Sequence, residues 1–280
     1  KGLVLSSIKI PTNPKQGKTK LINLIKTIIQ SLLDGSKHKI TAIGISMPGF
    51  CDEKGKLLAV GNVLSFLEGF NIKLFLEKNF HIPVIVKNDS LCFTMAESVL
   101  GAGKNHKVVL GVIWGSGIGA GLAKKTKSGW ETYSGALGSS IEFGHIPVYD
   151  MRFSKFTELE LLCGGAFLTK RYLKLGGEIK HPTVGDIYFS SEKLAKELMI
   201  ETFEHLGRGI ASVVNILNPD VIVLGGGVAK LPDVAYKKLF SQIKKYALKS
   251  HTKSLFLKRY EVSDDEGLLG AAYFAFSLGK

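Results

Sequence analysis

Apolar residues in the first hundred positions follow two different spacings. A helical spacing of about 3.6 residues recurs through 21–33, where Gly35 supplies a stop, and an apolar run at 40–46 predicts a buried strand. The elements predicted in order are a strand at 2–12, helix 21–33, strand 40–46, helix 72–80, strand 84–89 and helix 90–101. Strands and helices in alternation indicate an α/β layer.

The pattern changes after Gly103, and we place a domain boundary near residue 101. Predicted strands at 108–114 and 121–125 flank a glycine-rich turn and together predict a β-hairpin, after which a loop-rich stretch reaches Tyr149. The later predicted elements are helices 158–175 and 192–217, strand 221–224, helix 232–247, strand 254–260 and an apolar helix at 268–276.

Composition places the chain among soluble globular proteins. Its 280 residues are 45% hydrophobic and 22% charged, and no apolar run reaches the roughly 18 residues that a membrane span needs. Cys51, Cys92 and Cys163 lie far apart and form no disulfide framework or zinc-ligand spacing. We therefore expect a cytoplasmic protein with no membrane partner.

A net charge of +13 raises the question of nucleic acid binding. The lysines are scattered along the chain rather than gathered with interleaved aromatic residues, so a solvated surface is the favoured interpretation. We expect no nucleic acid partner, while the same positive field would favour a cosubstrate that carries phosphate.

Three glycine clusters follow predicted strands, and they lie at Pro48-Gly49, at 115–119 and at 225–227. Glycine lets backbone N–H groups approach a phosphate closely, although tight turns with positive φ also require glycine. The two later clusters together favour nucleotide binding. Neither matches the GxxxxGK[ST] pattern or opens a dinucleotide-binding unit, which disfavours a P-loop enzyme or a dehydrogenase.

Carboxylates and one histidine are the candidates for chemistry. Asp89 follows Asn88 at the end of a predicted strand, where it could take a proton from an attacking hydroxyl; spacing alone favours a helix N-cap instead. Glu142 and His145 could hydrogen-bond sugar hydroxyls or belong to a plain surface loop. Glu160 by itself is interpreted as a carboxylate on a helix surface.

Taken together, these segments resemble the ROK family, named for its repressors, open reading frames and kinases. The family order is PG, a GN step, NDxxCxxxxE, a GTGxGxG-like turn, GExGH, LExxxSG and NPDVIVLGGG. The matching positions in this chain are Pro48-Gly49, Gly61-Asn62, Asn88-Asp89 with Cys92, Gly115–Gly119, Glu142–His145, Leu159-Glu160 and Asn218–Gly227. Seven matches in order over nearly the whole chain make the resemblance specific.

The resemblance implies roles for these residues. Asp89 becomes the expected general base. The expected sugar-binding residues are Gly49, Asn62, Asn88, Glu142, His145 and Glu160, and the expected nucleotide-binding residues are Gly115, Ser116, Gly117, Gly225, Gly226 and Gly227.

The fold implied is actin-like (ribonuclease H-like), with two α/β lobes that close on substrates. We expect a first lobe at 1–100 joined by the last helix at 267–280, and a larger lobe at 101–266. The function implied is ATP-dependent phosphorylation of a hexose or an N-acetylhexosamine, of the glucose, N-acetylglucosamine or fructose class, with Mg²⁺ and in a homodimer. The NDSLCF segment is nearest to the form associated with N-acetylglucosamine kinases and fructokinases.

Three departures from the family pattern qualify this expectation. The DxGGT motif of the first strand is absent, so we expect about 20 further residues to precede this chain, including a strand that pairs in the middle of the sheet of the first lobe. The family zinc site joins the GExGH histidine to three cysteines, and none lies between Tyr149 and Leu159, so we expect no zinc and no bound metal at His145. Ser116 replaces the usual threonine, and Ile141 replaces a glycine.

Two alternatives to a kinase stay open from the sequence. One is a sugar-responsive transcriptional regulator of the ROK type, which would need an N-terminal helix-turn-helix. The other is a sugar-binding protein that has lost phosphoryl transfer.

Overall fold

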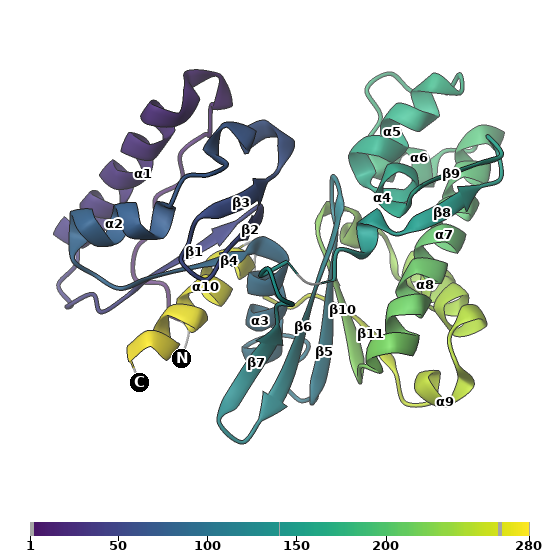
Figure 1. Cartoon of the computed structure of the whole chain (residues 1–280). Helices are drawn as coiled ribbons and strands as arrows, with labels where there is room; N and C mark the ends of the chain where they lie inside the picture. The colour runs from purple at the N-terminus through teal and green to yellow at the C-terminus, as the bar shows by residue number, and fades with distance from the viewer. Residues whose placement is uncertain (1–2, 140, 263–264, 280) are drawn as a thin grey trace. The chain divides into compact units, whose positions relative to one another are not determined.

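The computed structural model describes residues 3–139, 141–262 and 265–279, and the chain divides into two compact units (Figure 1). The first unit comprises Lys1–Ala96, Ser134–Ser140 and Ser263–Lys280, and the second comprises Glu97–Tyr133 and Ile141–Val262. Among the described residues, no helix combines the length and apolar character that crossing a membrane requires.

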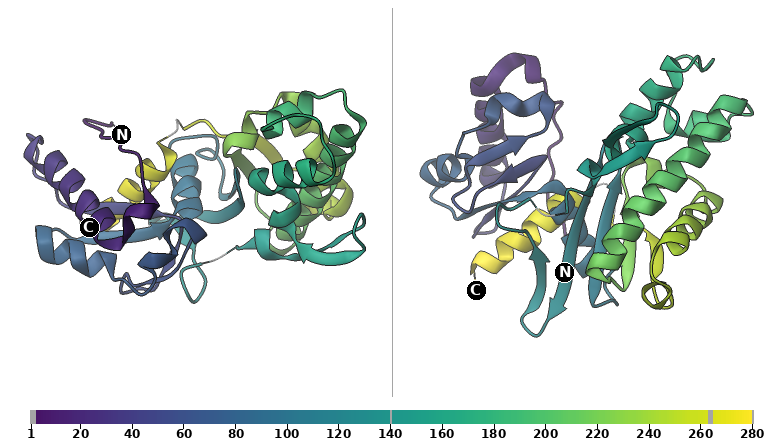
Figure 2. Two further views of the ribbon diagram at one scale, coloured as in Figure 1. Left: turned by 90° about the horizontal axis from the view of Figure 1, so that it is seen from above. Right: turned by 45° about the vertical axis from the view of Figure 1, so that its right-hand side comes forward.

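The first unit is built on two parallel strands, β1 (Ile43–Met47) and β4 (Val84–Asn88). Successive side chains of a strand point to opposite faces, so each strand supports two layers. Met47 on one face belongs to a hydrophobic core that also contains residues of α1 (Gly17–Asp34) and α2 (Ile72–Phe80). Gly44 on the other face lies against α10 (Glu266–Phe276), where a Cβ atom would come within 2.1 Å of a carbonyl oxygen of Ala271. Figure 2 shows α10 running beside these strands.

The rest of the first unit consists of short elements around this pair. They are the 3₁₀ segments η1 (Pro14–Gln16), η2 (Asn62–Leu67) and η5 (Ser277–Gly279), the antiparallel strands β2 (Gly49–Cys51) and β3 (Leu57–Val60), and helix α3 (Asp89–Val99), which continues into the second unit.

The strand predicted at 2–12 is not present among the described residues 3–13. These residues belong to no strand or helix, and the side chains of Leu3, Leu5 and Ile10 are exposed by 79%, 69% and 42%. A strand needs a neighbour that accepts and donates its backbone hydrogen bonds, and apolar composition alone supplies none. The prediction was wrong for this reason.

The second unit contains a five-stranded sheet in the order β11-β10-β5-β6-β7. Its strands are β5 (Val108–Trp114), β6 (Ile118–Thr126), β7 (Gly129–Tyr133), β10 (Val221–Gly225) and β11 (Phe256–Arg259). β10 is parallel to both β5 and β11, while β5, β6 and β7 are antiparallel neighbours. The helices α7 (Lys193–Leu217) and α8 (Asp233–Tyr246) lie along one face of this sheet (Figure 1).

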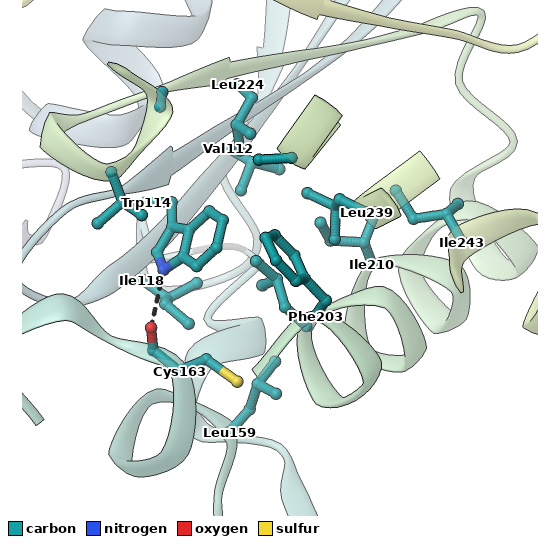
Figure 3. Close-up of a cluster of buried hydrophobic side chains, with 14 of the residues drawn as sticks. Val112, Trp114, Ile118, Leu159, Cys163, Phe203, Ile210, Leu224, Leu239 and Ile243 are labelled. Carbon is teal, nitrogen blue, oxygen red and sulfur yellow. Dashed lines mark hydrogen bonds between the residues drawn. The ribbon is translucent and has the colours of Figure 1, made fainter. Parts of the chain in front are cut away.

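A single hydrophobic core joins the sheet to these helices (Figure 3). Trp114 at the end of β5 is 2% exposed, and its ring packs edge-on against Phe203 of α7 with centroids 6.0 Å apart. The buried indole N–H would be costly without a partner, and it donates to the carbonyl oxygen of Cys163 over 2.7 Å. The end of β5 is therefore fixed in position, which matters because the glycine turn begins at the next residue.

The helix predicted at 158–175 is interrupted. α4 (Leu159–Cys163) and α5 (Gly165–Lys174) are separated at Gly164, where a Cβ atom would lie 2.9 Å from the carbonyl oxygen of Glu160 and 3.0 Å from that of Ser116. The glycine permits the chain to turn this close to the β5–β6 connection.

The stretch expected to be loop-rich contains regular structure, so that expectation was wrong in part. Besides β7, it includes η3 (Phe143–His145) and the beginning of an antiparallel hairpin formed by β8 (Pro147–Asp150) and β9 (Lys155–Glu158). The sequence analysis also did not predict the β2–β3 pair or the helices α6 (Val184–Phe189) and α9 (Lys249–Thr252). The second unit also contains the short 3₁₀ segment η4 (Gly227–Lys230).

Candidate active site

The predicted site residues form two groups, one in each unit. In the first unit, Asn88 ends β4 and its side-chain amide donates to the carbonyl oxygen of Gly49 over 2.9 Å. Gly49 has a φ of 102° and lies so close to β3 that a Cβ atom would come within 2.2 Å of the Ala59 carbonyl oxygen. Glycine is therefore required here by the backbone, and Asn88 holds the turn against the end of β4.

Asn88 also caps helix α3, which changes the interpretation of its neighbour. The Asn88 side-chain oxygen accepts from the backbone N–H of Ser90 over 2.9 Å and from that of Leu91 over 3.3 Å. These are bonds that an N-cap residue makes. Spacing alone favoured Asp89 as the cap, but the structure gives that position to Asn88 and makes Asp89 the first residue of the helix. The Asp89 carboxylate accepts from the backbone N–H of Ser90 over 2.8 Å.

The Asp89 side chain is exposed at the surface, although protein atoms surround it closely enough to remove part of its hydration. This desolvation raises the pKa of Asp89, and hydrogen bonds from the backbone N–H groups of Ser90 and Asp89 and from the Asn88 side chain lower it less. A carboxylate of raised pKa is a better proton acceptor. The expected sugar ligand Asn62 begins η2, but its side chain lies outside the described residues.

In the second unit, the glycine turn between β5 and β6 packs against Glu160. The Glu160 carboxylate accepts from the backbone N–H of Ile118 over 2.7 Å, and a Cβ atom on Gly117 would lie 2.3 Å from the same oxygen. The carbonyl oxygens of Gly115 and Ser116 accept the N–H groups of Gly165 and Ala166 at the start of α5, over 2.8 and 3.0 Å. The turn is thus held from two sides.

The second glycine cluster lies directly beside this turn. Gly225 ends the buried strand β10, and a Cβ atom on Gly226, which has a φ of 87°, would come within 2.6 Å of the Trp114 carbonyl group. No atom lies within 4 Å of a Cβ atom built on Gly227, so this residue faces open space. The structure therefore brings the two predicted nucleotide-binding clusters together.

A cavity of about 510 Å³ opens beside the two clusters. Its lining comprises Gly115, Ser116, Gly165, Ala166, Thr169, Thr183, Val184, Gly185, Phe189, Gly227, Val228, Lys230 and Leu231. Pockets for ligands of nucleotide size commonly have volumes of roughly 300–1,000 Å³. Glycine backbone, two threonine hydroxyl groups, an exposed phenyl ring and an ammonium group could serve the phosphates, the ribose and the base.

The sequence analysis missed the part of this lining that lies outside the glycine clusters. Thr183 begins a capping box, in which its hydroxyl accepts from the N–H of Asp186 while the Asp186 carboxylate accepts from the N–H of Thr183 over 2.8 Å. The T-x-x-D spacing was a signal for a helix start that the sequence analysis did not use. Lys230 follows Gly227 by only three residues and could have been found from the sequence, whereas nothing in the sequence pattern would have placed Phe189 beside the glycine turns.

The loop that carries Glu142 and His145 follows Ile141, whose φ is 60°. A β-branched residue is rarely found in this left-handed conformation, which explains why glycine suits the position. The Ile141 side chain is partly buried against the core of the second unit. Glu142 and His145 are both exposed, and Gly144 between them is buried against β6 and Glu160.

His145 bonds to a residue that the sequence analysis did not single out. Its Nδ1 atom lies 2.9 Å from a carboxylate oxygen of Glu158, and this bond is the main reason why the pKa of His145 is raised. The described residues contain no group of three or more His, Cys, Asp or Glu side chains that could hold a metal ion. The absence of zinc stays a prediction that elemental analysis after dialysis would test, and stoichiometric zinc would contradict it.

The family model described as "ROK family" matches residues 1–277. The chain belongs to the ROK family. A glucokinase from Halalkalibacterium halodurans is 26% identical over 298 residues, which cover 97% of this chain and 88% of that protein. An N-acetyl-D-glucosamine kinase from Mannheimia succiniciproducens is 25% identical, and the match covers 88% of this chain and 84% of that protein.

Solved structures of ROK proteins share the fold. A ROK hexokinase from Thermus thermophilus has a TM-score of 0.81 at 24% identity, covering 96% of this chain and 90% of that chain. A ROK glucokinase from Streptomyces griseus, solved with glucose and AMPPNP, has a TM-score of 0.77 at 23% identity, covering 99% and 93%. A ROK transcriptional regulator described as a homolog of the E. coli MLC protein also scores 0.77, at 21% identity, covering 90% and 66%. The actin-like, two-lobed α/β fold that the sequence predicted is confirmed.

Proposed function

We propose that this protein is a kinase that transfers the γ-phosphoryl group of ATP to a hydroxyl group of a hexose or an N-acetylhexosamine. The observation that carries the proposal is the cavity of about 510 Å³ beside the two glycine clusters, in a chain that belongs to the ROK family. The names of the related glucokinase and N-acetyl-D-glucosamine kinase support the choice of substrate class.

Asp89 is the proposed general base. Its carboxylate accepts the proton of the sugar hydroxyl while the hydroxyl oxygen forms a bond to the γ-phosphorus; the bond from that phosphorus to the bridging oxygen breaks, and ADP leaves. Asn88 supports this role because its side chain accepts the N–H groups of Ser90 and Leu91 at the start of α3, so the Asp89 carboxylate is not needed as the helix cap. Base catalysis of this kind contributes about 10²- to 10⁴-fold.

The cavity of the second unit is the proposed site for ATP. The phosphates would lie along Gly115, Ser116 and Gly117, and the adenosine along Gly225, Gly226 and Gly227, where exposed Phe189 and Lys230 supply an aromatic face and a positive charge. Backbone N–H groups and a lysine neutralise charge on a transferring phosphoryl group, which is the main contribution that a protein makes to this reaction.

We propose that Mg²⁺ binds together with ATP. The ion usually keeps several waters and is bound by phosphate oxygens with one or two carboxylates, so it needs no cage made by the protein. When bound, it neutralises charge on the phosphates.

Glu142, His145 and Glu160 are the proposed sugar ligands of the second unit, and Gly49, Asn62 and Asn88 those of the first. Glu160 differs from the others because one carboxylate oxygen is already bonded to the Ile118 N–H. We propose that Glu160 supports the glycine turn through that oxygen and meets the sugar through the other.

An ADP-release assay with a panel of sugars tests this function. Sugar-dependent ADP release supports it, and the panel should include glucose, fructose and N-acetylglucosamine. Gly227→Ala gives a second test, because its added methyl group meets no protein atom within 4 Å but enters the cavity. The variant should fold normally and raise the KM for ATP without changing the KM for the sugar. An unchanged KM for ATP would contradict the assignment of the cavity.

A transcriptional regulator is the second candidate function, because a regulator of the same family shares the fold. A regulator of this kind would shift a DNA fragment in a gel and release no ADP, whereas the kinase proposal predicts the reverse result. Sugar binding without either activity would favour a binding protein that has lost phosphoryl transfer.

A further inference from the structure

His145 carries an imidazole ring that the surrounding protein only partly covers. Its side chain is 59% exposed, so burial alone does not fix the ring orientation. The hydrogen bond that one ring nitrogen makes determines which nitrogen bears the proton, and so whether the other nitrogen meets a ligand as donor or acceptor. The bond of 2.9 Å from Nδ1 to Glu158 is the contact that can make this selection.

The backbone places Glu158 opposite His145 with little freedom. Glu158 ends β9 and pairs with Pro147 at the start of β8, two residues after His145. The next residue, Leu159, is fully buried, and its N–H donates to the carbonyl oxygen of Ile146 over 3.1 Å. The segment after His145 is therefore joined to Glu158 and Leu159 directly beside the His145–Glu158 pair.

The far end of the same hairpin is anchored by charges. Asp150 is 2% exposed and accepts from Arg171 of α5 over 3.2 Å and from the backbone N–H of Arg152 over 3.0 Å. The Arg171 guanidinium also pairs with Glu201 of α7 over 3.0 Å, and Arg152 pairs with Glu197 over 3.4 Å. Because α5 and α7 belong to the core of the second unit, the hairpin holds Glu158 on a fixed support.

The chemistry of the ring then follows from the position of the carboxylate. A carboxylate oxygen accepts hydrogen bonds and donates none when ionised, so the Nδ1 atom that faces it carries a proton. In the neutral ring this leaves Nε2 as an acceptor for a hydroxyl group. Glu142, Glu158 and Glu160 all act on His145 and favour its protonated form, and partial burial opposes them.

We propose that Glu158 is a positioning residue that holds His145 in the Nδ1–H form and presents Nε2 to a sugar hydroxyl. The second half of this inference rests on the proposed sugar kinase function, and the first half does not. Glu158 itself does not touch the sugar.

Nitrogen NMR of the ligand-free protein with ¹⁵N-labelled histidine tests the first half, and a His145→Gln variant identifies the His145 signals. At a pH where the ring is neutral, the wild-type protein should show a protonated Nδ1 and an unprotonated Nε2. Glu158→Ala should give a mixture of the two tautomers and lower the pKa of His145, because the bond to Glu158 is the leading cause of its elevation. Glu158→Gln keeps an acceptor oxygen and should preserve much of the tautomer preference.

Kinetics test the second half with glucose and N-acetylglucosamine. For whichever sugar the protein phosphorylates, Glu158→Ala should raise the KM by about 3- to 10-fold, which is the loss expected for one solvent-accessible hydrogen bond. The KM for ATP should stay unchanged. Glu178→Ala, which removes an exposed glutamate elsewhere in the second unit, is the matched control and should change neither value.

The outcomes separate the two ideas. An Nε2–H ring in the wild-type protein, or tautomers unaffected by Glu158→Ala, would overturn the positioning role. Altered tautomers with an unchanged sugar KM would overturn the link to sugar binding. If the wild-type protein phosphorylates no sugar, the proposed function fails, while the NMR result still decides whether Glu158 orients His145.

Discussion

The two ends of helix α3 carry carboxylates in contrasting environments. Glu97, near the C-terminal end, is fully buried, and its oxygens accept from the backbone N–H groups of Ala102 over 2.9 Å, Glu261 over 3.1 Å and Val262 over 2.8 Å. Asp89, at the first position, is exposed, and its hydrogen-bond donors are residues 88–90 of its own segment. Desolvation raises the pKa of both groups.

The difference shows how a carboxylate that holds the fold together can be told from one that is available to a substrate. Glu97 ties the end of α3 to residues 261–262, and Gly101 has no side chain because a Cβ atom would lie 2.1 Å from the Glu97 carboxylate. The hydrogen bonds that the Glu97 carboxylate accepts therefore hold parts of the backbone together. Asp89 keeps acceptor capacity for a substrate, and its neighbour Asn88 performs the capping.

The largest effect is expected for Asp89→Asn. If Asp89 is the base, the change should lower kcat by at least about 10²-fold while the KM for the sugar changes little, because the amide cannot take a proton. Thermal stability should stay close to that of the wild-type protein. Steady-state kinetics and a thermal melt check both parts, and a near-normal kcat would mean that both carboxylates of α3 are structural.

Glu97→Ala, in contrast to Asp89→Asn, should act mainly on stability. Three backbone N–H groups would lose their acceptor in a buried place, which should destabilise the protein by roughly 3 kcal/mol. Denaturant unfolding measures the loss of stability. A variant that unfolds at the same denaturant concentration as the wild-type protein would refute the structural role of Glu97. Glu97→Gln, which keeps one acceptor oxygen and removes the charge, is the control and should lie between the two.

The pH dependence of activity sharpens the contrast further. Asp89 must be ionised to accept a proton, so kcat/KM should fall about tenfold per pH unit once the pH drops below its pKa. Desolvation raises that pKa above the usual 3.8, which moves the acid limb of the profile to higher pH. A kcat/KM profile with no acid limb down to the ordinary aspartate range would argue against a desolvated base.

The smallest effect is expected for Asn88→Ala. Loss of the cap on α3 should cost about 1 kcal/mol, since the N–H groups of Ser90 and Leu91 lose one acceptor. Loss of the bond to the Gly49 carbonyl oxygen should also loosen that turn. Denaturant unfolding gives the first quantity; equal stabilities would show that Asp89 caps the helix after all.

Elements with strong periodicity could be predicted well from the sequence. The helix predicted at 72–80 coincides with α2, and the predicted strand 108–114 coincides with β5. A helical spacing of apolar residues marks the first, and a short continuous apolar run followed by glycine marks the second. Short elements such as β2, β8 and α6 have too few residues to show a period. The strand expected at 2–12 failed for a different reason, since strands depend on pairing partners that lie elsewhere in the chain.

The candidate site divides in the same way. Glycines at 115–117 and 225–227 marked two turns, but only the sheet order β10-β5-β6 places them side by side, with Gly226 against Trp114. Glu158 gave no signal because its importance comes from the pairing of β8 with β9. The proposed roles of the individual site residues stay predictions.

The sequence by itself determined the family, the fold class and the residue types available for chemistry. Those properties follow from local patterns and from the order of motifs along the chain. The tertiary structure alone decided which neighbour uses each polar group: Asn88 rather than Asp89 caps α3, Glu160 bonds to the glycine turn, and Glu158 meets His145. Hydrogen bonds depend on distances between atoms that are far apart in sequence, and only the packed strands and helices fix those distances.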